Sequence, residues 1–374
     1  MDRAPDRGSA ESQDVDLAIE QYLRSIESGN YRRTVRSVLS TWSEWLVEEH
    51  NIELLSGISV LLCRKYARHL KTRSRDGEMK ASTANTYYSV VRAFLGFCVD
   101  EELIDSNPAA VKRAVDELPS ESGDVDRQFW GEPERKAFLR HVDERARNSM
   151  DGSSIDRVDA YRDRALVYVL AFSGVRGGEV FSDPADKKRN GARWNDLDLE
   201  NGTLKVFGKS REYEYAQVPE EAINVLERYR RVLDPATEDW PLFPSNHAPS
   251  KYSAIRNALD KEGLIETEIE QLLQDNSPDG VIREYKITPP ALSKNGARNV
   301  VQRLCNEADV EIDGEPLKLH GARRGLGHEL YQKGHAELAQ SALRHSSIDV
   351  THESYSDIQA SDTADKVGDV LNSE

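Results

Sequence analysis

Four residues near the C-terminal end of the chain have the types and the spacing to act together on an anionic group. These residues are His320, Arg323, His345 and Tyr355. His320 and Arg323 are three residues apart, so on a helix both side chains project from one face, where an imidazole and a guanidinium can converge on one oxygen. Tyr355 follows His345 by ten residues, beyond the polar segment 346–354, and its phenol oxygen is a candidate nucleophile.

Two earlier segments complete a recognisable set. Residues 171–180 read Ala-Phe-Ser-Gly-Val-Arg-Gly-Gly-Glu-Val and contain Arg176 and Glu179, and residues 206–210 read Val-Phe-Gly-Lys-Ser and contain Lys209. Together with the His-x-x-Arg at 320 and the later Leu-Arg-His-Ser-Ser, this order resembles the tyrosine site-specific recombinases, which include phage integrases and Xer-type resolvases. A lone His-x-x-Arg would carry little information, but the full set in family order is specific.

The resemblance implies cleavage of DNA through a covalent 3′-phosphotyrosyl intermediate. Tyr355 is the expected nucleophile, and the ester that it forms can be reversed by a free DNA hydroxyl. The transition state carries extra charge on its non-bridging oxygens, which Arg176 and Arg323 can hold by forked hydrogen bonds. No metal and no cofactor are expected.

The resemblance also assigns roles in proton transfer and positioning. His320 would donate to a phosphate oxygen or take the phenol proton, and Lys209 would protonate the departing 5′ oxygen. His345 would hydrogen-bond a non-bridging oxygen, while Glu179 would hold Arg176 in place. Taken singly, each of these residues has an ordinary structural explanation, such as a surface ion pair or a core histidine, and only their joint order favours catalysis.

Some features depart from the family pattern. Arg344 stands where the family commonly has Gly before the second His, and the ten-residue spacing from His345 to Tyr355 is one longer than in many members. A flexible loop before Tyr355 is expected to absorb the extra residue. Tyr331 is a weaker nucleophile candidate, because it lies only eight residues beyond Arg323, on the same expected helix.

Composition sets the broad class of protein. The chain has 374 residues, of which 38% are hydrophobic, so it can form two domains with real cores. No apolar run suggests a signal peptide or a membrane span, so a soluble cytoplasmic protein, associated with the nucleoid, is expected. The three cysteines, Cys63, Cys98 and Cys305, are too few and too dispersed for a disulfide framework or a thiolate metal site.

The charge balance is unusual for a protein that binds DNA. The net charge is −16, and Arg outnumbers Lys by 34 to 16. Phosphate binding rests on cations, and a high salt concentration would screen the repulsion between an acidic surface and DNA. We therefore hypothesise a halophilic host, an archaeon or one of its viruses or plasmids. Residues 64–80 form a basic segment, with seven basic and two acidic residues, which is a candidate phosphate-binding surface.

The N-terminal part predicts a helical bundle. Apolar residues recur at helical spacing in four stretches between residues 14 and 118. Ser82 or Thr83 is the expected N-cap of the fourth helix. The resemblance implies that this bundle is the core-binding domain, and the candidate DNA contacts are Arg73, Lys80, Ser82, Thr83 and Asn85.

The C-terminal part predicts a mainly helical domain with a small antiparallel sheet. Helices are expected over 132–142, 161–172, 220–232, 252–274 and 292–307, and strand-like runs over 194–199, 203–207 and 213–218. Asn201-Gly202 is a strong hairpin signal, and Lys209 falls at the tip of the second hairpin. Residues 275–290 are expected to form a loop, and the insert at 252–290 has no assigned chemistry.

The expected domain organisation has five parts. These are a disordered tail at 1–13, the DNA-binding bundle at 14–118, a linker at 119–126 that would let the two domains close around DNA, the catalytic domain at 127–359, and a tail at 360–374 that docks on a neighbouring subunit. The expected partners are double-stranded DNA and further copies of the chain, monomeric or dimeric when free and tetrameric when two sites are paired. An accessory DNA-bending or directionality protein is a further partner that the resemblance allows.

The expected function is integration or excision of a mobile element. Resolution of plasmid or chromosome dimers by the same chemistry is an alternative, and it would use two identical repeats as sites. A DNA-binding protein with an inactive catalytic set is an alternative of another class, distinguished by site binding without a covalent adduct. A type IB topoisomerase-like enzyme would instead relax supercoils without preferring a site.

Overall fold

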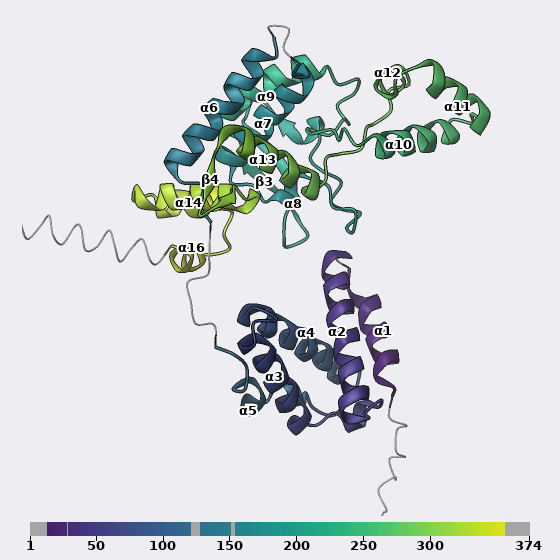
Figure 1. Ribbon diagram of the computed structural model, residues 1–374, viewed down its shortest axis with the longest axis vertical. Coiled ribbons are helices and arrows are strands. Elements are labelled where there is room, and N and C mark those ends of the chain that lie inside the picture. Colours follow the sequence, from purple (N-terminus) through teal and green to yellow (C-terminus); the bar gives the residue numbers. More distant parts are fainter. Residues whose placement is uncertain (1–12, 28, 121–127, 151–153, 356–374) are drawn as a thin grey trace, which may run out of the picture. The chain divides into compact units, whose positions relative to one another are not determined.

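The computed structural model describes residues 13–27, 29–120, 128–150 and 154–355 (Figure 1). Across these ranges the chain is mainly helical, with one three-stranded and one two-stranded antiparallel sheet, which confirms the predicted fold class. The chain divides into two compact units, residues 1–125 and 126–374. None of the helices in the described ranges is both long and apolar enough to cross a lipid bilayer.

The first unit is a bundle of α-helices around its own core. Its helices are α1 (Val15–Ser25), α2 (Gly29–His50), α3 (Val60–Arg75), α4 (Ala81–Asp100) and the short α5 (Lys112–Val115), with 3₁₀ turns at Leu55–Gly57 and Pro108–Ala110. The buried faces repeat at helical spacing because each helix turns one apolar stripe toward the centre, where Trp42, Tyr88 and Phe94 are among the largest fully buried side chains.

Two details of the predicted bundle are wrong. Helix α4 begins at Ala81 with Lys80 as its N-cap, so Ser82 and Thr83 lie inside the first turn and do not cap the helix. The carbonyl of Ser82 instead accepts a hydrogen bond from Thr86 Oγ1 at 2.8 Å. The apolar spacing of the third predicted helix places Leu61 on its core face, but in the structure Leu61 is exposed and the neighbouring Leu62 is buried.

The second unit is built on three packed helices and a small sheet. Helix α7 (Arg157–Ser173) packs against α6 (Glu132–Asn148) and α9 (Glu220–Leu233) in one continuous core. The sheet has the order β1 (Leu197–Asp198), β2 (Thr203–Phe207), β3 (Tyr213–Gln217), and Phe207 pairs with Tyr213 across the second hairpin. Residues at the start of the first predicted strand form a 3₁₀ turn, Trp194–Asp196.

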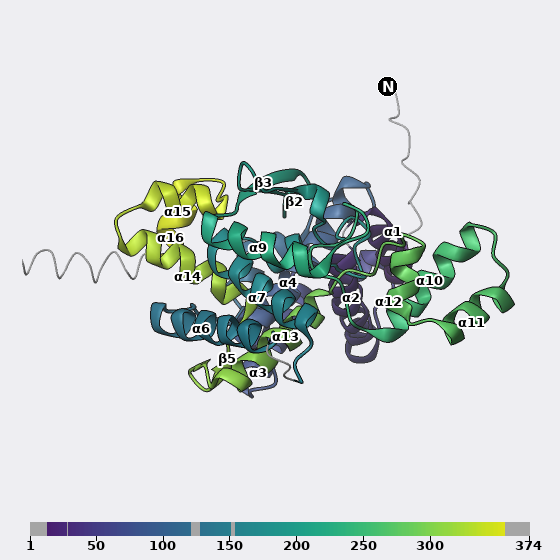
Figure 2. The same cartoon turned by 90° about the horizontal axis from the view of Figure 1, so that it is seen from above.

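The insert forms three helices that stand to one side of the second unit (Figures 1 and 2). They are α10 (Ala248–Lys261), α11 (Glu266–Asp275) and α12 (Pro278–Glu284). The prediction of one helix over 252–274 is wrong because Gly263, with φ of +95°, separates α10 from α11. The prediction of a loop over 275–290 is also wrong, since Ser277 caps α12 and Pro278 occupies its first turn.

The C-terminal part of the described chain is helical. It contains α13 (Lys294–Ala308), the short hairpin β4 (Glu311–Ile312) and β5 (Glu315–Pro316), α14 (Leu319–Gln332), α15 (Ala336–Leu343) and α16 (Ile348–Ser354). Helix α16 occupies the segment that was expected to be a flexible loop before Tyr355, and Ser347 caps it. The three cysteines are buried and form no disulfide. Residues 1–12, most of the expected linker and the expected docking tail at 360–374 lie outside the described residues.

Candidate functional site

A cationic cleft of about 740 Å³ in the second unit contains three of the predicted catalytic residues: Arg176, Lys209 and His345. They come from the N-cap position of α8 (Gly177–Val180), the β2–β3 hairpin and the segment between α15 and α16. We call this site the cationic cleft; its complete lining is Arg176, Lys209, Ser210, Glu214, Arg344, His345, Ser346 and Val350. Segments more than 160 residues apart in the sequence thus face one space.

A sharp turn after α7 sets the position of Arg176. Helix α7 ends at Gly174, whose φ of +62° suits glycine, and Arg176 then serves as the N-cap of the short helix α8 (Gly177–Val180). The backbone N–H of Arg176 donates to Glu179 Oε2 at 2.7 Å, and its Nη1 donates to Glu179 Oε1 at 2.8 Å. Glu179 is buried, so one carboxylate fixes both the backbone and the guanidinium of Arg176.

Helix α14 carries His320 in its first turn and Arg323 one turn later. Arg323 is buried, and its guanidinium donates to the carbonyls of Gly174 and Leu343, which ties α14 to the turn after α7 and to the end of α15. Partial burial of the imidazole, followed by the charges of Arg324 and Arg323, lowers the pKa of His320 to about 4, although the residue as a whole is exposed.

His345 is half-buried, and its Nδ1 lies 2.9 Å from Thr351 Oγ1 on α16. Burial and the charges of Arg323 and Arg176 lower its pKa to about 4. Both histidines are therefore neutral at pH 7 in the free protein. Their electrostatic coupling to the same two arginines places His320, His345, Arg176 and Arg323 in one charged neighbourhood.

The predicted nucleophile is buried beside this neighbourhood rather than in the cleft lining. Tyr355 is 4% exposed, and its hydroxyl donates to the carbonyl of Arg324 at 3.4 Å. Burial raises the pKa of Tyr355 to about 12, against the opposing charges of Arg323 and Arg324. The hydroxyl fits against α14 because residue 327 is glycine: a Cβ there would lie 2.0 Å from the tyrosine oxygen.

The alternative nucleophile has a different partner. Tyr331 is also buried, on α14 as expected, and its ring centre lies 5.6 Å from that of Tyr355. Its hydroxyl is 2.7 Å from His352 Nδ1 on α16. Tyr331 and His352 therefore help to seat α16 on α14.

The hairpin that carries Lys209 is tied to the turn of Arg176. Lys209 is exposed in the loop between β2 and β3. Arg189 Nη1 donates to the carbonyl of Gly178 at 2.6 Å and to that of Phe207 at 3.0 Å, and its Nη2 donates to the carbonyl of Gly208 at 2.9 Å. One guanidinium thus joins α8 to the base of the hairpin.

Two charged residues of the cleft, Glu214 and Arg344, were not predicted as site residues from the sequence. Arg344 was noted only as a departure from the family pattern, and Glu214 was read as part of a strand. In the structure Arg344 donates through Nη2 to Glu179 at 2.5 Å and through Nε to Glu214 at 3.2 Å. The unusual residue type beside His345 was the available signal for Arg344, while no local signal marks Glu214.

The predicted DNA contacts of the first unit are only partly free to bind. Arg73 donates to Glu78 Oε2 at 2.8 Å, and Asn85 Nδ2 donates to the carbonyl of Pro119 at 3.3 Å. Lys80 and Ser82 are exposed, and Thr83 is half-buried. Elsewhere in the basic segment, Arg64 and Arg68 both pair with Glu117 and Arg75 pairs with Asp76.

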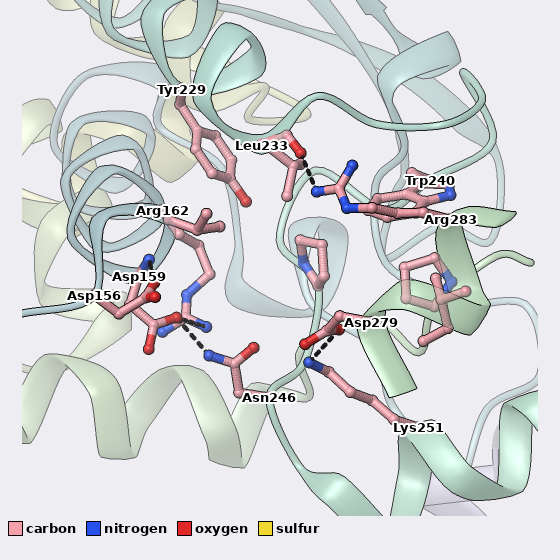
Figure 3. Close-up of a pocket in the computed structure, with 14 residues that line it drawn as sticks. Asp156, Asp159, Arg162, Tyr229, Leu233, Trp240, Asn246, Lys251, Asp279 and Arg283 are labelled. Atoms are coloured by element: carbon pink, nitrogen blue, oxygen red, sulfur yellow. Dashed lines mark hydrogen bonds and ion pairs between the residues drawn. The ribbon is translucent and has the colours of Figure 1, made fainter. Parts of the chain in front are cut away.

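A second cavity, of about 570 Å³, contains none of the predicted site residues (Figure 3). It lies between α7, α9 and the insert. Its charged groups are paired with one another: Arg162 with Asp159 and Lys251 with Asp279, while Arg283 donates to backbone carbonyls and lies over Trp240. Within the residues that the structure describes, no group of three or more His, Cys, Asp and Glu side chains is arranged to hold a metal ion.

Comparisons with known proteins agree on one family. The model of the phage integrase family matches residues 148–362. Tyrosine recombinase XerD of Proteus mirabilis is 29% identical over 244 residues, which cover 62% of this chain and 67% of the relative. Tyrosine recombinase XerC of Halalkalibacterium halodurans is 23% identical over 309 residues, covering 82% of this chain and 80% of the relative.

Solved structures share the fold at low sequence identity. The XerH recombinase bound to palindromic difH substrate in a post-cleavage complex aligns with a TM-score of 0.60 at 15% identity, covering 96% of this chain and 84% of that chain. A lambda integrase dimer bound to a COC′ core site aligns with a TM-score of 0.55 at 15% identity, covering 92% and 77%.

Proposed function

The chain belongs to the phage integrase family, and we propose from this premise that it is a site-specific tyrosine recombinase that cleaves and rejoins DNA through Tyr355. The observation that carries the proposal is the cationic cleft, which brings Arg176, Lys209 and His345 together and adjoins His320 and Arg323. Relatives of this chain are named tyrosine recombinases.

The proposed reaction exchanges one ester bond for another. The Tyr355 oxygen attacks the scissile phosphorus, a tyrosyl–phosphorus bond forms at the 3′ side, and the bond from phosphorus to the 5′ oxygen breaks. Arg176 and Arg323 stabilise the charge on the non-bridging oxygens. Attack by the 5′ hydroxyl of a partner strand on the phosphotyrosine reverses the step and releases the enzyme.

Proton transfers accompany both bond changes. Lys209 gives a proton to the departing 5′ oxygen, and a neutral His320 accepts the phenol proton as the tyrosine attacks. His345 donates a hydrogen bond to a non-bridging oxygen, with its ring held by Thr351. Because the hydroxyl of Tyr355 is buried against α14, α16 must shift before attack.

The biological role that we propose is integration or excision of a mobile element. Resolution of chromosome or plasmid dimers is the alternative, and it is supported by the names XerD and XerC of two relatives. The two roles differ in their DNA: integration joins two different attachment sites, whereas resolution acts on two copies of one site.

We also propose the partners and the setting of the reaction. Double-stranded DNA and a second copy of the chain are supported by similar structures, which are DNA complexes of the XerH recombinase and of a lambda integrase dimer. Pairing of two sites would require four copies, docked through residues 360–374, with an accessory protein to set direction. The net charge of −16 supports a host cytoplasm of high salt, where the enzyme would work at the nucleoid.

Covalent trapping tests the proposal. Wild type and Tyr355→Phe are incubated with DNA of the source genome in molar KCl, denatured with SDS, and the DNA that stays linked to protein is sequenced. Adducts with wild type alone, clustered at one sequence, are expected. Adducts with both proteins would move the nucleophile to Tyr331, and a protein that binds one site without any adduct would be a DNA-binding protein with an inactive catalytic set.

A further inference from the structure

A chain of hydrogen bonds joins separate parts of the cationic cleft. In the hairpin loop, Ser210 Oγ donates to Glu214 Oε1 at 3.2 Å, and Glu214 Oε2 accepts from Arg344 Nε at 3.2 Å. The same guanidinium donates through Nη2 to Glu179 Oε2 at 2.5 Å, and Glu179 Oε1 accepts from Arg176. The loop that carries Lys209 is therefore connected to Arg176 through one arginine.

The backbone position of Arg344 is unusual. It is the C-cap of α15 and has φ of +51°, a conformation that favours glycine, and it directly precedes His345. Its side chain is only 10% exposed, and its Nη1 is buried with no hydrogen-bond partner among the described residues. A strained backbone and an unpaired buried donor do not stabilise the fold, so the reason for an arginine lies in what its other nitrogens hold.

We propose that Arg344 is a positioning residue for the cleavage step: it holds Glu179 and Glu214 at a fixed separation and thereby keeps Lys209 opposite Arg176. The inference rests on the proposed function and deepens it. The hairpin is also tied at its base by Arg189 and at its tip by Arg211, whose Nη1 donates to Asp186 Oδ2 at 2.9 Å. Loss of Arg344 removes the link from Glu214 to Glu179, which sets the position of the loop relative to Arg176, while Arg176 stays bonded to Glu179.

This role predicts a defect in one chemical step, the protonation of the leaving 5′ oxygen. An alkoxide leaves poorly without a proton, whereas a thiolate leaves readily because thiols have a much lower pKa. DNA in which sulfur replaces the bridging 5′ oxygen therefore bypasses the proton that Lys209 supplies. Loss of a residue that positions Lys209 should therefore slow cleavage of the oxygen substrate and have much less effect on cleavage of the sulfur substrate.

The experiment compares Arg344→Gly, Arg344→Lys and wild type on both substrates, using the site mapped by covalent trapping. Glycine suits φ of +51°, so the Gly variant is expected to fold. Single-turnover adduct formation on oxygen DNA should slow about 10-fold to 100-fold, because a misplaced Lys209 loses part of the roughly 100-fold to 10,000-fold that a general acid contributes, and on sulfur DNA by less than about threefold. Arg344→Lys should be similarly slow on oxygen DNA, because one ammonium cannot bridge the two carboxylates as a guanidinium fork does.

Glu214→Gln and Lys286→Gly complete the design. Glu214→Gln weakens the same connection from the hairpin side and should show the same preference for the sulfur substrate. Lys286 also has φ of +51° but lies outside the cationic cleft, so Lys286→Gly controls for the backbone change and should cleave both substrates at the wild-type rate.

Two results would overturn the inference while leaving the proposed function intact. One is wild-type cleavage of oxygen DNA by Arg344→Gly, and the other is equal slowing on both substrates, which would indicate a general structural defect. Failure of wild type to form an adduct with either substrate would overturn the proposed function and this inference together.

Discussion

At the scale of single residues, the free protein holds its two histidines and its candidate nucleophile in their uncharged forms. His320 and His345 have pKa values of about 4 and Tyr355 has a pKa of about 12, so the imidazoles are neutral and the phenol keeps its proton at pH 7. The same arginine charges that lower the histidine pKa values would be offset by a bound phosphodiester. DNA binding should therefore raise the pKa values of both histidines and make His320 a stronger base for the phenol proton.

The histidines also make stability depend on pH. Their folded pKa values lie below the unfolded value of about 6.5, so the unfolded state binds more protons between about pH 6.5 and pH 4 and the folded state loses stability as the pH falls through that window. Between pH 7 and pH 5, the midpoint temperature of thermal unfolding should fall less for His345→Gln than for wild type. The exposed His335 lies outside the cationic cleft, and His335→Gln should behave as wild type. A drop in midpoint temperature as large in His345→Gln as in wild type would contradict the prediction.

Gly327 offers a test of the buried position of Tyr355. In Gly327→Ala the new methyl would lie 2.0 Å from the tyrosine oxygen and 2.5 Å from Leu343 Cδ1, so the tyrosine must leave its site. The unfolding free energy should fall by about 1–3 kcal/mol, as overpacked sites do. The pKa of Tyr355 should fall from about 12 toward about 10, measured by ultraviolet titration against Tyr355→Phe. Gly96→Ala is the helical control, because its Cβ would meet only an ordinary contact.

At the scale of elements, long amphipathic helices could be predicted and short capped ones could not. Apolar stripes at helical spacing predicted α1 to α4, because burial of one face determines their pattern. The helices α12 and α16 have seven residues each, and the residues that start α12, Ser-Pro-Asp-Gly, are also typical of turns. The contact of Arg344 with Glu214 joins residues 130 positions apart, which one sequence without tertiary information cannot indicate.

The attachment of the hairpin gives an element-scale prediction. Arg189 donates to three carbonyls on α8 and at the base of the hairpin, and a charge-assisted hydrogen bond contributes about 1.5–3 kcal/mol. In Arg189→Ala, backbone amides of residues 205–213 should exchange with solvent at least about tenfold faster than in wild type, because local opening loses these bonds. Arg193→Ala removes an arginine that contacts Asp239 instead, and should leave hairpin exchange unchanged. Equal protection in Arg189→Ala and wild type would rule out this attachment.

At the scale of the whole molecule, the distribution of charge determines the affinity for DNA and its dependence on salt. The chain carries a net charge of −16, and four arginines of the basic segment are paired with carboxylates. Long-range repulsion from phosphate falls as salt rises, while binding through paired arginines requires the carboxylates to release them. Glu117 competes most strongly with phosphate for these arginines, because Arg68 and Arg64 both pair with it and lower its pKa to about 2.

Glu117→Gln should therefore strengthen DNA binding if the basic segment faces phosphate. The change frees Arg64 and Arg68 for phosphate contacts, and each new contact steepens the slope of log affinity against log salt by about 0.9. Affinity is measured by titrating labelled site DNA at several KCl concentrations. Glu101→Gln removes the same charge from an exposed position at the end of α4 and serves as the matched control. Because both variants change net charge equally, an identical gain in both would show that only net charge matters and that the basic segment lies away from the DNA.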